Sequence, residues 1–278
     1  MRTIELVPGV RSSVIGFGCA PILGSVDAAR ARRAVQLALD CGVTHFDVAR
    51  SYGYGEAERF LGQILRGRRS DVVIATKFGI EATPAASLLR IAKPIVRSLL
   101  ARRKRSQGGT TAGATAGFQP GRIFVRRAPL TVRTLRRSLE KSLGCLRTDY
   151  VDCLFLHEPR EAVVEIDDLA AEAARLKQAG RIRAWGIAFN YEDRAIHDAY
   201  LDRFDVLQFN NSPGAPHYPE VLASRQSAAN VFFSPLRGSG SAQAGSELLR
   251  TMISDFSRSV VLCSMFSESH IRENTSVA

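Results

Sequence analysis

Eight short apolar runs recur along this chain of 278 residues, and most of them are followed by a segment with helical periodicity. The runs are rich in β-branched and aromatic residues and are bounded by turn residues, which is typical of buried strands. Eight alternations of strand and helix predict an α/β fold, a parallel (β/α)8 TIM barrel, for which about 250 residues is a usual length. We therefore expect residues 1–278 to form a single barrel domain. The predicted strands are residues 14–19, 44–49, 72–77, 150–157, 183–189, 206–211, 230–236 and 259–265.

The intervening segments have apolar residues at helical spacing. In residues 27–42 these positions are Ala34, Leu37, Ala38 and Cys41, and a glycine follows as a helix stop. The short N-terminal segment contains a Pro-Gly turn and is expected to form a hairpin that closes the bottom of the barrel. Three further segments repeat the helical pattern: residues 55–67, 131–146 and 166–182.

The net charge of +11 is concentrated in one stretch between the third and fourth predicted strands. Residues 82–139 contain thirteen basic residues and no acidic one, whereas the rest of the chain is nearly neutral. We predict a basic insert at residues 82–130, whose Gly-, Thr- and Ala-rich part at 106–121 has too little apolar bulk to pack and should be a flexible surface loop.

Three interpretations of the basic insert differ in the partner they imply. The first is a solvated excursion that steers anionic ligands, the second is an amphipathic segment that contacts an anionic membrane or a partner protein, and the third is a patch that binds phosphate or nucleic acid. Pro94 would interrupt a long helix, and no aromatic residues alternate with the basic ones to stack on bases. We do not expect nucleic acid as a partner, and peripheral membrane contact stays open.

The N-terminus lacks the pattern of a signal peptide, and no run of about 18 apolar residues occurs, so we expect a cytoplasmic protein. The five cysteines are odd in number, widely spaced and contain no CxxC pair. They suggest neither a disulfide framework nor a zinc site, and we expect buried free thiols.

Reactive side chains lie at the carboxyl ends of three consecutive predicted strands. Asp47, Lys77 and His157 fall at the ends of the second, third and fourth strands, and Tyr52 follows Asp47 by five residues. Taken alone, each of the three strand-end residues has a structural explanation: Asp47 could cap the following segment, Lys77 could reach solvent, and His157 could be a core residue. In a parallel barrel, however, catalytic residues come from this end of the strands, so the four together predict an active site.

The same residues carry a family resemblance. FDVARSYGYGEAERFLG at 46–62, IATKFG at 74–79 and TDYVDCLFLHEP at 148–159 resemble motifs of the aldo-keto reductases, and further motifs follow in order almost to residue 275. The resemblance implies an NAD(P)H-dependent oxidoreductase that reduces an aldehyde or ketone to an alcohol, or catalyses the reverse reaction. It also implies that Asp47, Tyr52, Lys77 and His157 are the catalytic tetrad.

The chemistry of these side chains agrees with that role. A carbonyl that accepts hydride needs a proton on its oxygen, and Tyr52 can supply one as general acid. We expect the ammonium of Lys77, held by Asp47, to lower the pKa of the tyrosine, and His157 to donate a hydrogen bond to the carbonyl oxygen. No side chain transfers hydride, so a nicotinamide cofactor is required.

The chain has no Rossmann-type GxGxxG motif, so the cofactor would lie across the barrel mouth as the resemblance suggests. Carried over by resemblance, Gln208 would hold the nicotinamide carboxamide and Phe233 would stack on its ring, with NADP preferred and NAD left open. The residues expected to bind the cofactor are Gly18, Cys19, Asp47, Asn190, Gln208, Phe233, Ser234, Leu236, Arg237, Gly238, Gly240, Ser264, Ser267, Arg272, Glu273 and Asn274.

The sequence departs from the family pattern in several places. Ala188 and Phe189 stand where a Ser-Asn pair usually grips the carboxamide, and Asn190 would restore that grip only through a shifted loop. Ser264 and His270 replace residues that are often basic near the 2′-phosphate. The sequence also stops four residues after Asn274, so we expect a pocket that is more open, or one that the basic insert closes instead. The sequence does not identify the substrate.

Two other functions are compatible with the residues. The first is a nucleotide-binding barrel that serves a partner or a membrane through the basic residues at 88–137. The second is a metal-dependent barrel hydrolase using His45, Asp47 and His157. Hydrolases of that kind often have a His-x-His pair on the first strand, which this chain lacks, so we expect no metal.

Overall fold

The computed structural model describes residues 1–83, 86, 124–237 and 245–278. Eight parallel strands in it form a closed barrel in which β12 pairs with β3, and this confirms the predicted (β/α)8 fold. All eight predicted runs form strands, with ends that differ by a few residues. The barrel strands are β3 (Ile15–Gly18), β4 (His45–Asp47), β5 (Val73–Phe78), β8 (Val151–His157), β9 (Ile182–Phe189), β10 (Val206–Asn210), β11 (Asn230–Phe233) and β12 (Ser259–Cys263).

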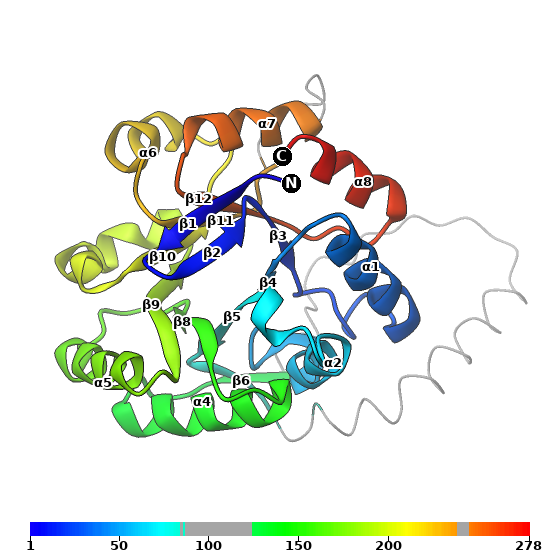
Figure 1. Cartoon of the computed structure of the whole chain (residues 1–278). Helices are drawn as coiled ribbons and strands as arrows, with labels where there is room; N and C mark the ends of the chain where they lie inside the picture. Colours follow the sequence, from blue (N-terminus) through cyan, green and yellow to red (C-terminus); the bar gives the residue numbers. More distant parts are fainter. Residues whose placement is uncertain (84–85, 87–123, 238–244) are drawn as a thin grey trace, which may run out of the picture.

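The helices of the described residues lie around the outside of the barrel (Figure 1). Polar side chains begin several of them: Asp27 accepts a hydrogen bond from the amide of Arg30, and Thr131 accepts one from Thr134. After β9 the chain forms two 3-10 helices, η4 (Tyr191–Ile196) and η5 (Asp198–Arg203), in place of the α-helix of a regular (β/α)8 repeat. The α-helices are α1 (Ala28–Asp40), α2 (Ala57–Ile64), α4 (Val132–Leu146), α5 (Ile166–Gln178), α6 (Tyr218–Arg225), α7 (Gly245–Asp255) and α8 (Glu268–Ser276).

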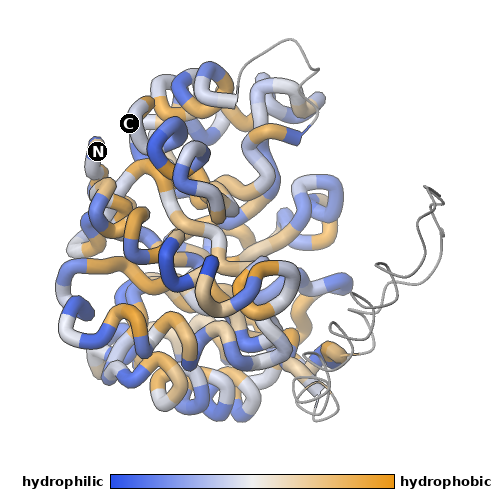
Figure 2. Tube along the Cα trace, turned by 90° about the vertical axis from the view of Figure 1, so that its right-hand side faces the viewer, coloured by the Kyte–Doolittle hydropathy of each residue, from blue (hydrophilic) through white to orange (hydrophobic). Residues whose placement is uncertain are grey.

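The N-terminal hairpin closes the amino end of the barrel, as predicted. β1 (Thr3–Val7) and β2 (Val10–Ser13) pair antiparallel around Gly9, whose φ of 77° favours glycine. Leu6 and Val10 are fully buried in one cluster with inward-facing residues of the barrel strands. A second and larger cluster fills the space between barrel and helices. Hydrophobic segments accordingly lie inside the molecule and hydrophilic ones mostly at its periphery (Figure 2).

A short antiparallel ribbon not predicted from the sequence frames the basic insert. β6 (Ile80–Ala82) pairs with β7 (Val125–Arg127), and an ion pair of 2.9 Å joins Glu81 to Arg126. Most of the predicted insert at 82–130 lies outside the described residues, and so do its expected flexible loop and the arginine-rich run. The assignment of the whole chain to one domain stays a prediction.

Two smaller expectations concern cysteines and membrane spans. All five cysteines are free, and Cys19, Cys153 and Cys263 are buried, whereas Cys41 and Cys145 are partly exposed. No helix within the described residues has the length and apolar character needed to cross a bilayer.

Candidate active site

Three neighbouring strands bring the predicted catalytic residues together at the carboxyl end of the barrel. Asp47 ends β4, Lys77 lies near the end of β5, and His157 ends β8, which pairs with β5. Tyr52 begins the 3-10 helix η1 (Tyr52–Gly55) that follows β4. Gly53 has a φ of 58°, and a Cβ there would lie 2.6 Å from the carbonyl oxygen of Ile22, so this tight turn requires glycine.

Lys77 is the centre of the site. Its ammonium donates to the carboxylate of Asp47, to the carbonyl oxygen of Val48 at 3.3 Å and to the hydroxyl of Tyr52 at 3.3 Å. Lys77 and Asp47 are only 3% and 4% exposed. The second carboxylate oxygen of Asp47 accepts a hydrogen bond of 2.8 Å from Nε2 of Gln208. The ion pair is therefore held in one geometry by its neighbours.

The environment shifts the pKa of three of these groups. Burial alone would lower the pKa of Lys77, but the charge of Asp47 and the contact with Tyr52 raise it above its ordinary value. Burial raises the pKa of Tyr52, and the opposing effect of Lys77 is smaller. Burial, with Lys77 and Arg127 acting in the same direction, lowers the pKa of His157 well below its ordinary value. At neutral pH the site thus holds an ammonium, a protonated phenol and a neutral imidazole.

The direction of the Tyr52 shift corrects the expectation from the sequence. Lys77 does act to lower the pKa of the tyrosine, as expected, but the loss of hydration in the buried site has the larger effect. Tyr52 consequently keeps its proton at neutral pH in this state of the protein.

A buried glutamate outside the tetrad connects the segments that carry it. Glu58 of α2 is 1% exposed and accepts a hydrogen bond of 2.7 Å from Thr76 on β5, next to Lys77. Its other oxygen is paired with Arg50, which lies between Asp47 and Tyr52 in the sequence. This contact fixes the Tyr52 loop against the strand that carries Lys77.

A cavity of about 200 Å³ opens over the four residues. Glu158, which the sequence analysis missed, lies in its wall with a φ of 45°, and its carbonyl oxygen accepts a hydrogen bond from Arg127. Its place directly after His157 was the signal that could have identified it. The lining residues are Gly18, Ala20, Asp47, Tyr52, Lys77, His157, Glu158, Ala188, Gln208, Phe233, Ser234, Leu262 and Ser264.

A second cavity of about 490 Å³ adjoins the first and shares Ser234, Leu262 and Ser264 with it. The two cavities together give an elongated path from the tetrad to α8, of the kind that a dinucleotide needs. The second cavity is lined by Ser234, Pro235, Leu236, Arg237, Gly245, Leu262, Cys263, Ser264, Met265, His270, Glu273 and Asn274.

The residues of the first cavity fit a nicotinamide. Oε1 of Gln208 is buried and has no hydrogen-bond partner in the described part of the chain, so it can accept from a carboxamide NH2. Phe233 presents an aromatic ring in the same wall. Gly18 packs so closely that a Cβ would lie 2.9 Å from the hydroxyl of Ser264, which keeps this wall flat.

Most of the residues predicted to bind cofactor line one of the two cavities, but four do not. Asn190 is in neither lining, and its carbonyl oxygen accepts from the amide of Asp193. Ser267 caps α8, and Arg272 forms a 2.9 Å ion pair with Glu268. Cys19 is buried, with its amide donating to the carbonyl oxygen of Asp47. Gly238 and Gly240 lie outside the described residues.

The alternative hydrolase site is incomplete, because Asp47 and His157 line the first cavity and His45 does not. His45 is fully buried and its Nδ1 lies 3.1 Å from the hydroxyl of Ser12, on the hairpin side of the barrel. Within the described residues, no group of three His, Cys, Asp or Glu side chains is arranged to hold a metal ion.

Comparison with known proteins gives the family. The profile of the Aldo/keto reductase family matches residues 14–214. The chain belongs to this family. Aldo-keto reductase YhdN of Bacillus subtilis is 26% identical over 188 residues, which cover 65% of this chain and 44% of the relative. L-glyceraldehyde 3-phosphate reductase of Escherichia coli is 36% identical over 187 residues, which cover 65% of this chain and 42% of that relative. The matches thus span less than half the length of these relatives.

Solved structures of aldo-keto reductases share the fold. The holo form of an enzyme from Bacillus halodurans superposes with a TM-score of 0.67 at 22% identity, covering 96% of this chain and 87% of that one. An aldo-keto reductase from Klebsiella pneumoniae in complex with NADPH superposes with a TM-score of 0.65 at 19% identity, and the match covers 99% of this chain and 89% of that one.

Proposed function

We propose that this protein is an NAD(P)H-dependent oxidoreductase that reduces an aldehyde or ketone to an alcohol, or catalyses the reverse reaction. The observation that carries the proposal is the hydroxyl of Tyr52 at 3.3 Å from the buried Lys77 ammonium, in a cavity that His157 also lines. Membership of the Aldo/keto reductase family supports the same reaction class.

Tyr52 is the proton donor in this proposal. Its raised pKa keeps the phenol protonated until a carbonyl oxygen that gains charge draws the proton away. The O–H bond of Tyr52 then breaks as the new O–H bond on the substrate forms. The neighbouring ammonium of Lys77 stabilises the phenolate left behind, and Asp47 keeps that ammonium charged and in place. In the oxidising direction the phenolate takes the proton back.

His157 orients the carbonyl. Because its lowered pKa keeps the imidazole neutral, the ring has one N–H, which can donate to the substrate oxygen. Its Nδ1 has no partner among the described residues. A neutral donor also avoids placing a second positive charge beside Lys77.

The cofactor, when bound, supplies the hydride. We propose NADP, with NAD as the alternative, because the Klebsiella pneumoniae structure of the same fold is a complex with NADPH. Gln208 and Phe233 would hold the nicotinamide end, and Arg237, Glu273 and Asn274 would line the path of the other end.

The substrate would be a small molecule with a carbonyl or alcohol group. The relatives act on different compounds by name: one is the L-glyceraldehyde 3-phosphate reductase above, and another is D-threo-aldose 1-dehydrogenase of a Pseudomonas species, 25% identical over 242 residues. A cytoplasmic location and a membrane or partner role of the basic insert remain predictions from the sequence.

The experiment is a pair of measurements on the purified protein. Fluorescence titration gives the Kd of NADPH and NADH, and the oxidation of each is then followed with a panel of aldehydes and ketones. We expect tighter binding of NADPH and turnover of at least one carbonyl compound. Tight binding without any turnover would favour a nucleotide-binding module instead, and absence of binding would contradict the proposal.

A further inference from the structure

Asn211 follows β10 and has a buried side chain with no partner. The residue is 1% exposed, and neither its Nδ2 nor its Oδ1 has a hydrogen-bond partner in the described part of the protein. Its backbone is well fixed, because its amide donates to the carbonyl oxygen of Phe233 at 3.2 Å. A buried polar group without a hydrogen-bond partner destabilises the folded state, because it has lost its contacts with water. A side chain with two such groups therefore suggests that something else binds there.

Asn211 lines a third cavity, of about 160 Å³, between the loops that follow β9, β10 and β11. This volume is several times the roughly 30 Å³ that one water occupies. Ser234 lines this cavity and both of the cavities already described, so the three meet at that residue. A ligand in the catalytic site is thus a neighbour of the Asn211 cavity.

Four other polar side chains of this cavity, those of Glu192, Asn210, Ser212 and His217, are already engaged. Nδ2 of Asn210 lies 3.2 and 3.3 Å from the carboxylate oxygens of Glu192, and its Oδ1 accepts from the amide of Tyr191 at 2.6 Å. Ser212 donates to the carbonyl oxygen of Arg237. Nε2 of His217 lies 3.0 Å from the carbonyl oxygen of Asn210. Asn211 differs from these neighbours because both of its hydrogen-bonding groups lack a partner.

The free groups of Asn211 define the ligand chemistry. A carboxylate or phosphate could accept from Nδ2 but would leave Oδ1 without a donor, and an ammonium would do the reverse. A hydroxyl group donates and accepts, and two adjacent hydroxyls satisfy both ends of the amide. Glu192 and Arg237 place one charge of each sign in the cavity wall, so these two residues together add no net charge to it.

We propose that Asn211 is a binding site for the hydroxyl groups of a polyhydroxylated ligand that also occupies the catalytic cavity. The inference rests on the proposed oxidoreductase function. The hydroxyls have two sources: a hydroxylated carbonyl substrate, or a ribose of the cofactor that passes Ser234. Either source places a sugar-like group at the loop after β10.

The test compares the protein with the Asn211→Leu variant, which keeps similar volume but cannot form hydrogen bonds. Glyceraldehyde is the hydroxylated probe, propanal is the matched probe without hydroxyls, and NADPH is titrated by fluorescence. A lost neutral hydrogen bond changes binding by about five- to tenfold. A loss of that size in kcat/KM for glyceraldehyde, with propanal unchanged, supports the substrate source. A similar rise in the Kd of NADPH supports the cofactor source.

The proposal is overturned if all three quantities stay within twofold of the parent protein. A higher Tm of Asn211→Leu in that case would mean that the amide is only hydrated. The variant Asn211→Ser, which is smaller and still polar, replaces Asn211→Leu if the leucine variant does not fold. If the parent protein shows no turnover, the thermal shift produced by glyceraldehyde and by propanal, with and without NADPH, still tests the site independently of the proposed reaction.

Discussion

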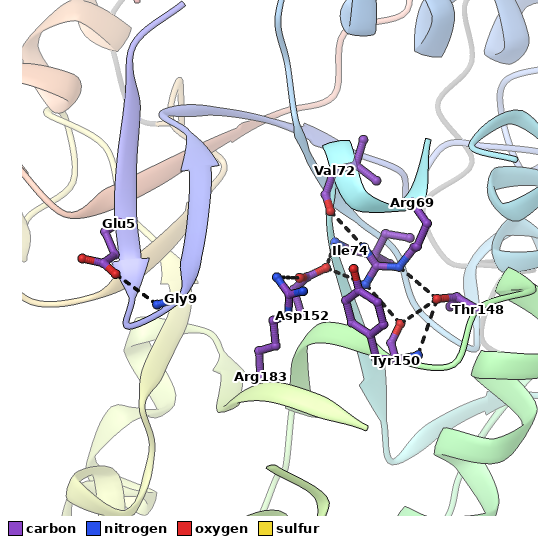
Figure 3. Close-up of polar contacts among 9 residues, drawn as sticks. All are labelled: Glu5, Gly9, Arg69, Val72, Ile74, Thr148, Tyr150, Asp152 and Arg183. Carbon is purple, nitrogen blue, oxygen red and sulfur yellow. Dashed lines mark hydrogen bonds and ion pairs between the residues drawn. The ribbon is translucent and has the colours of Figure 1, made fainter. Parts of the chain in front are cut away.

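Each end of the barrel contains a buried carboxylate paired with a cation. At the amino end, Asp152 on β8 is fully buried and accepts hydrogen bonds from the amide of Ile74 at 2.8 Å and from Arg69 at 2.7 Å (Figure 3). Its other oxygen lies 3.2 Å from Arg183. The guanidinium groups of Arg69 and Arg183 lie 3.8 and 4.6 Å from the centre of the Tyr150 ring. At the carboxyl end, the corresponding pair is Lys77 and Asp47.

The two ends differ in what surrounds the pair. The amino end is closed by the N-terminal hairpin, whose turn is fixed by a 3.0 Å hydrogen bond from the amide of Gly9 to Glu5 (Figure 3). The carboxyl end opens into a cavity, and there Gln208 and His157 keep buried polar atoms without a partner among the described residues. The carboxylate at the amino end is thus covered by protein, whereas the pair of Lys77 and Asp47 lies in the wall of a cavity that can hold a ligand.

The largest effect is expected from Lys77→Met. The change removes the ammonium that stabilises the phenolate of Tyr52, and we expect kcat to fall by roughly 10³-fold, a typical size for the loss of a charged group that assists proton transfer. The variant Lys177→Met is the control, since Lys177 forms only a partly exposed ion pair with Asp205. A kcat of Lys77→Met within tenfold of the parent protein would show that the pair of Lys77 and Asp47, like the ion pair at the amino end, serves stability and not catalysis.

A second prediction concerns pH and His45, the buried histidine that contacts Ser12 of the N-terminal hairpin. Burial lowers the pKa of His45 to about 4 from an ordinary value near 6.5. The unfolded chain therefore binds a proton between pH 6.5 and 4 that the folded protein does not, so stability falls as pH falls through this window. The full effect is about 3 kcal/mol.

Urea denaturation at several pH values measures this effect, with His45→Gln as the comparison. The glutamine variant should lose the part of the pH dependence between 6.5 and 4 that His45 contributes, and keep the part that comes from His157, whose pKa is also lowered. Equal dependence in both proteins would assign the titration to other groups, of which His157, with its lowered pKa, is the first candidate.

A smaller effect is expected from Asp152→Asn at the amino end. The amide of asparagine keeps the shape of the carboxylate but removes the charge that Arg69 and Arg183 face. The side chains of Arg69 and Arg183 are 20% and 45% exposed, so solvent limits the loss of stability. We expect the free energy of unfolding to fall by about 2 kcal/mol, while kcat per folded molecule is unchanged. Asp149→Asn, nearby in the sequence, is the control. A large fall in kcat with an unchanged free energy of unfolding would contradict the assignment of stability to the amino end and of catalysis to the carboxyl end.

The sequence predicted the features that depend on pattern alone. Alternating strands and helices gave the barrel, and the strand ends at Asp47, Lys77 and His157 gave the shared site, because parallel strands end at one rim. It did not predict the β6–β7 ribbon, whose two short strands are separated by more than forty residues. The direction of the Tyr52 pKa was also missed, since sequence shows the charge of Lys77 but not the burial that opposes it.

The free amide of Asn211 and the position of Asn190 likewise require coordinates. In the sequence, Asn190, Asn210 and Asn211 are asparagines at the end of a predicted strand or directly after one, and nothing distinguishes them. The structure distinguishes them: the side chain of Asn210 hydrogen-bonds Tyr191 and Glu192, while the side chain of Asn211 has no hydrogen-bond partner among the described residues.

The central claim is that Tyr52 donates the proton, and the most direct test is the rate of NADPH oxidation by Tyr52→Phe at saturating cofactor. Tyr150→Phe, which removes a hydroxyl at the amino end, is the matched control. We predict that kcat of Tyr52→Phe falls by roughly 10²- to 10⁴-fold while the Kd of NADPH stays within about twofold. A kcat within tenfold of the parent protein would contradict the account, because another group would then have to supply the proton.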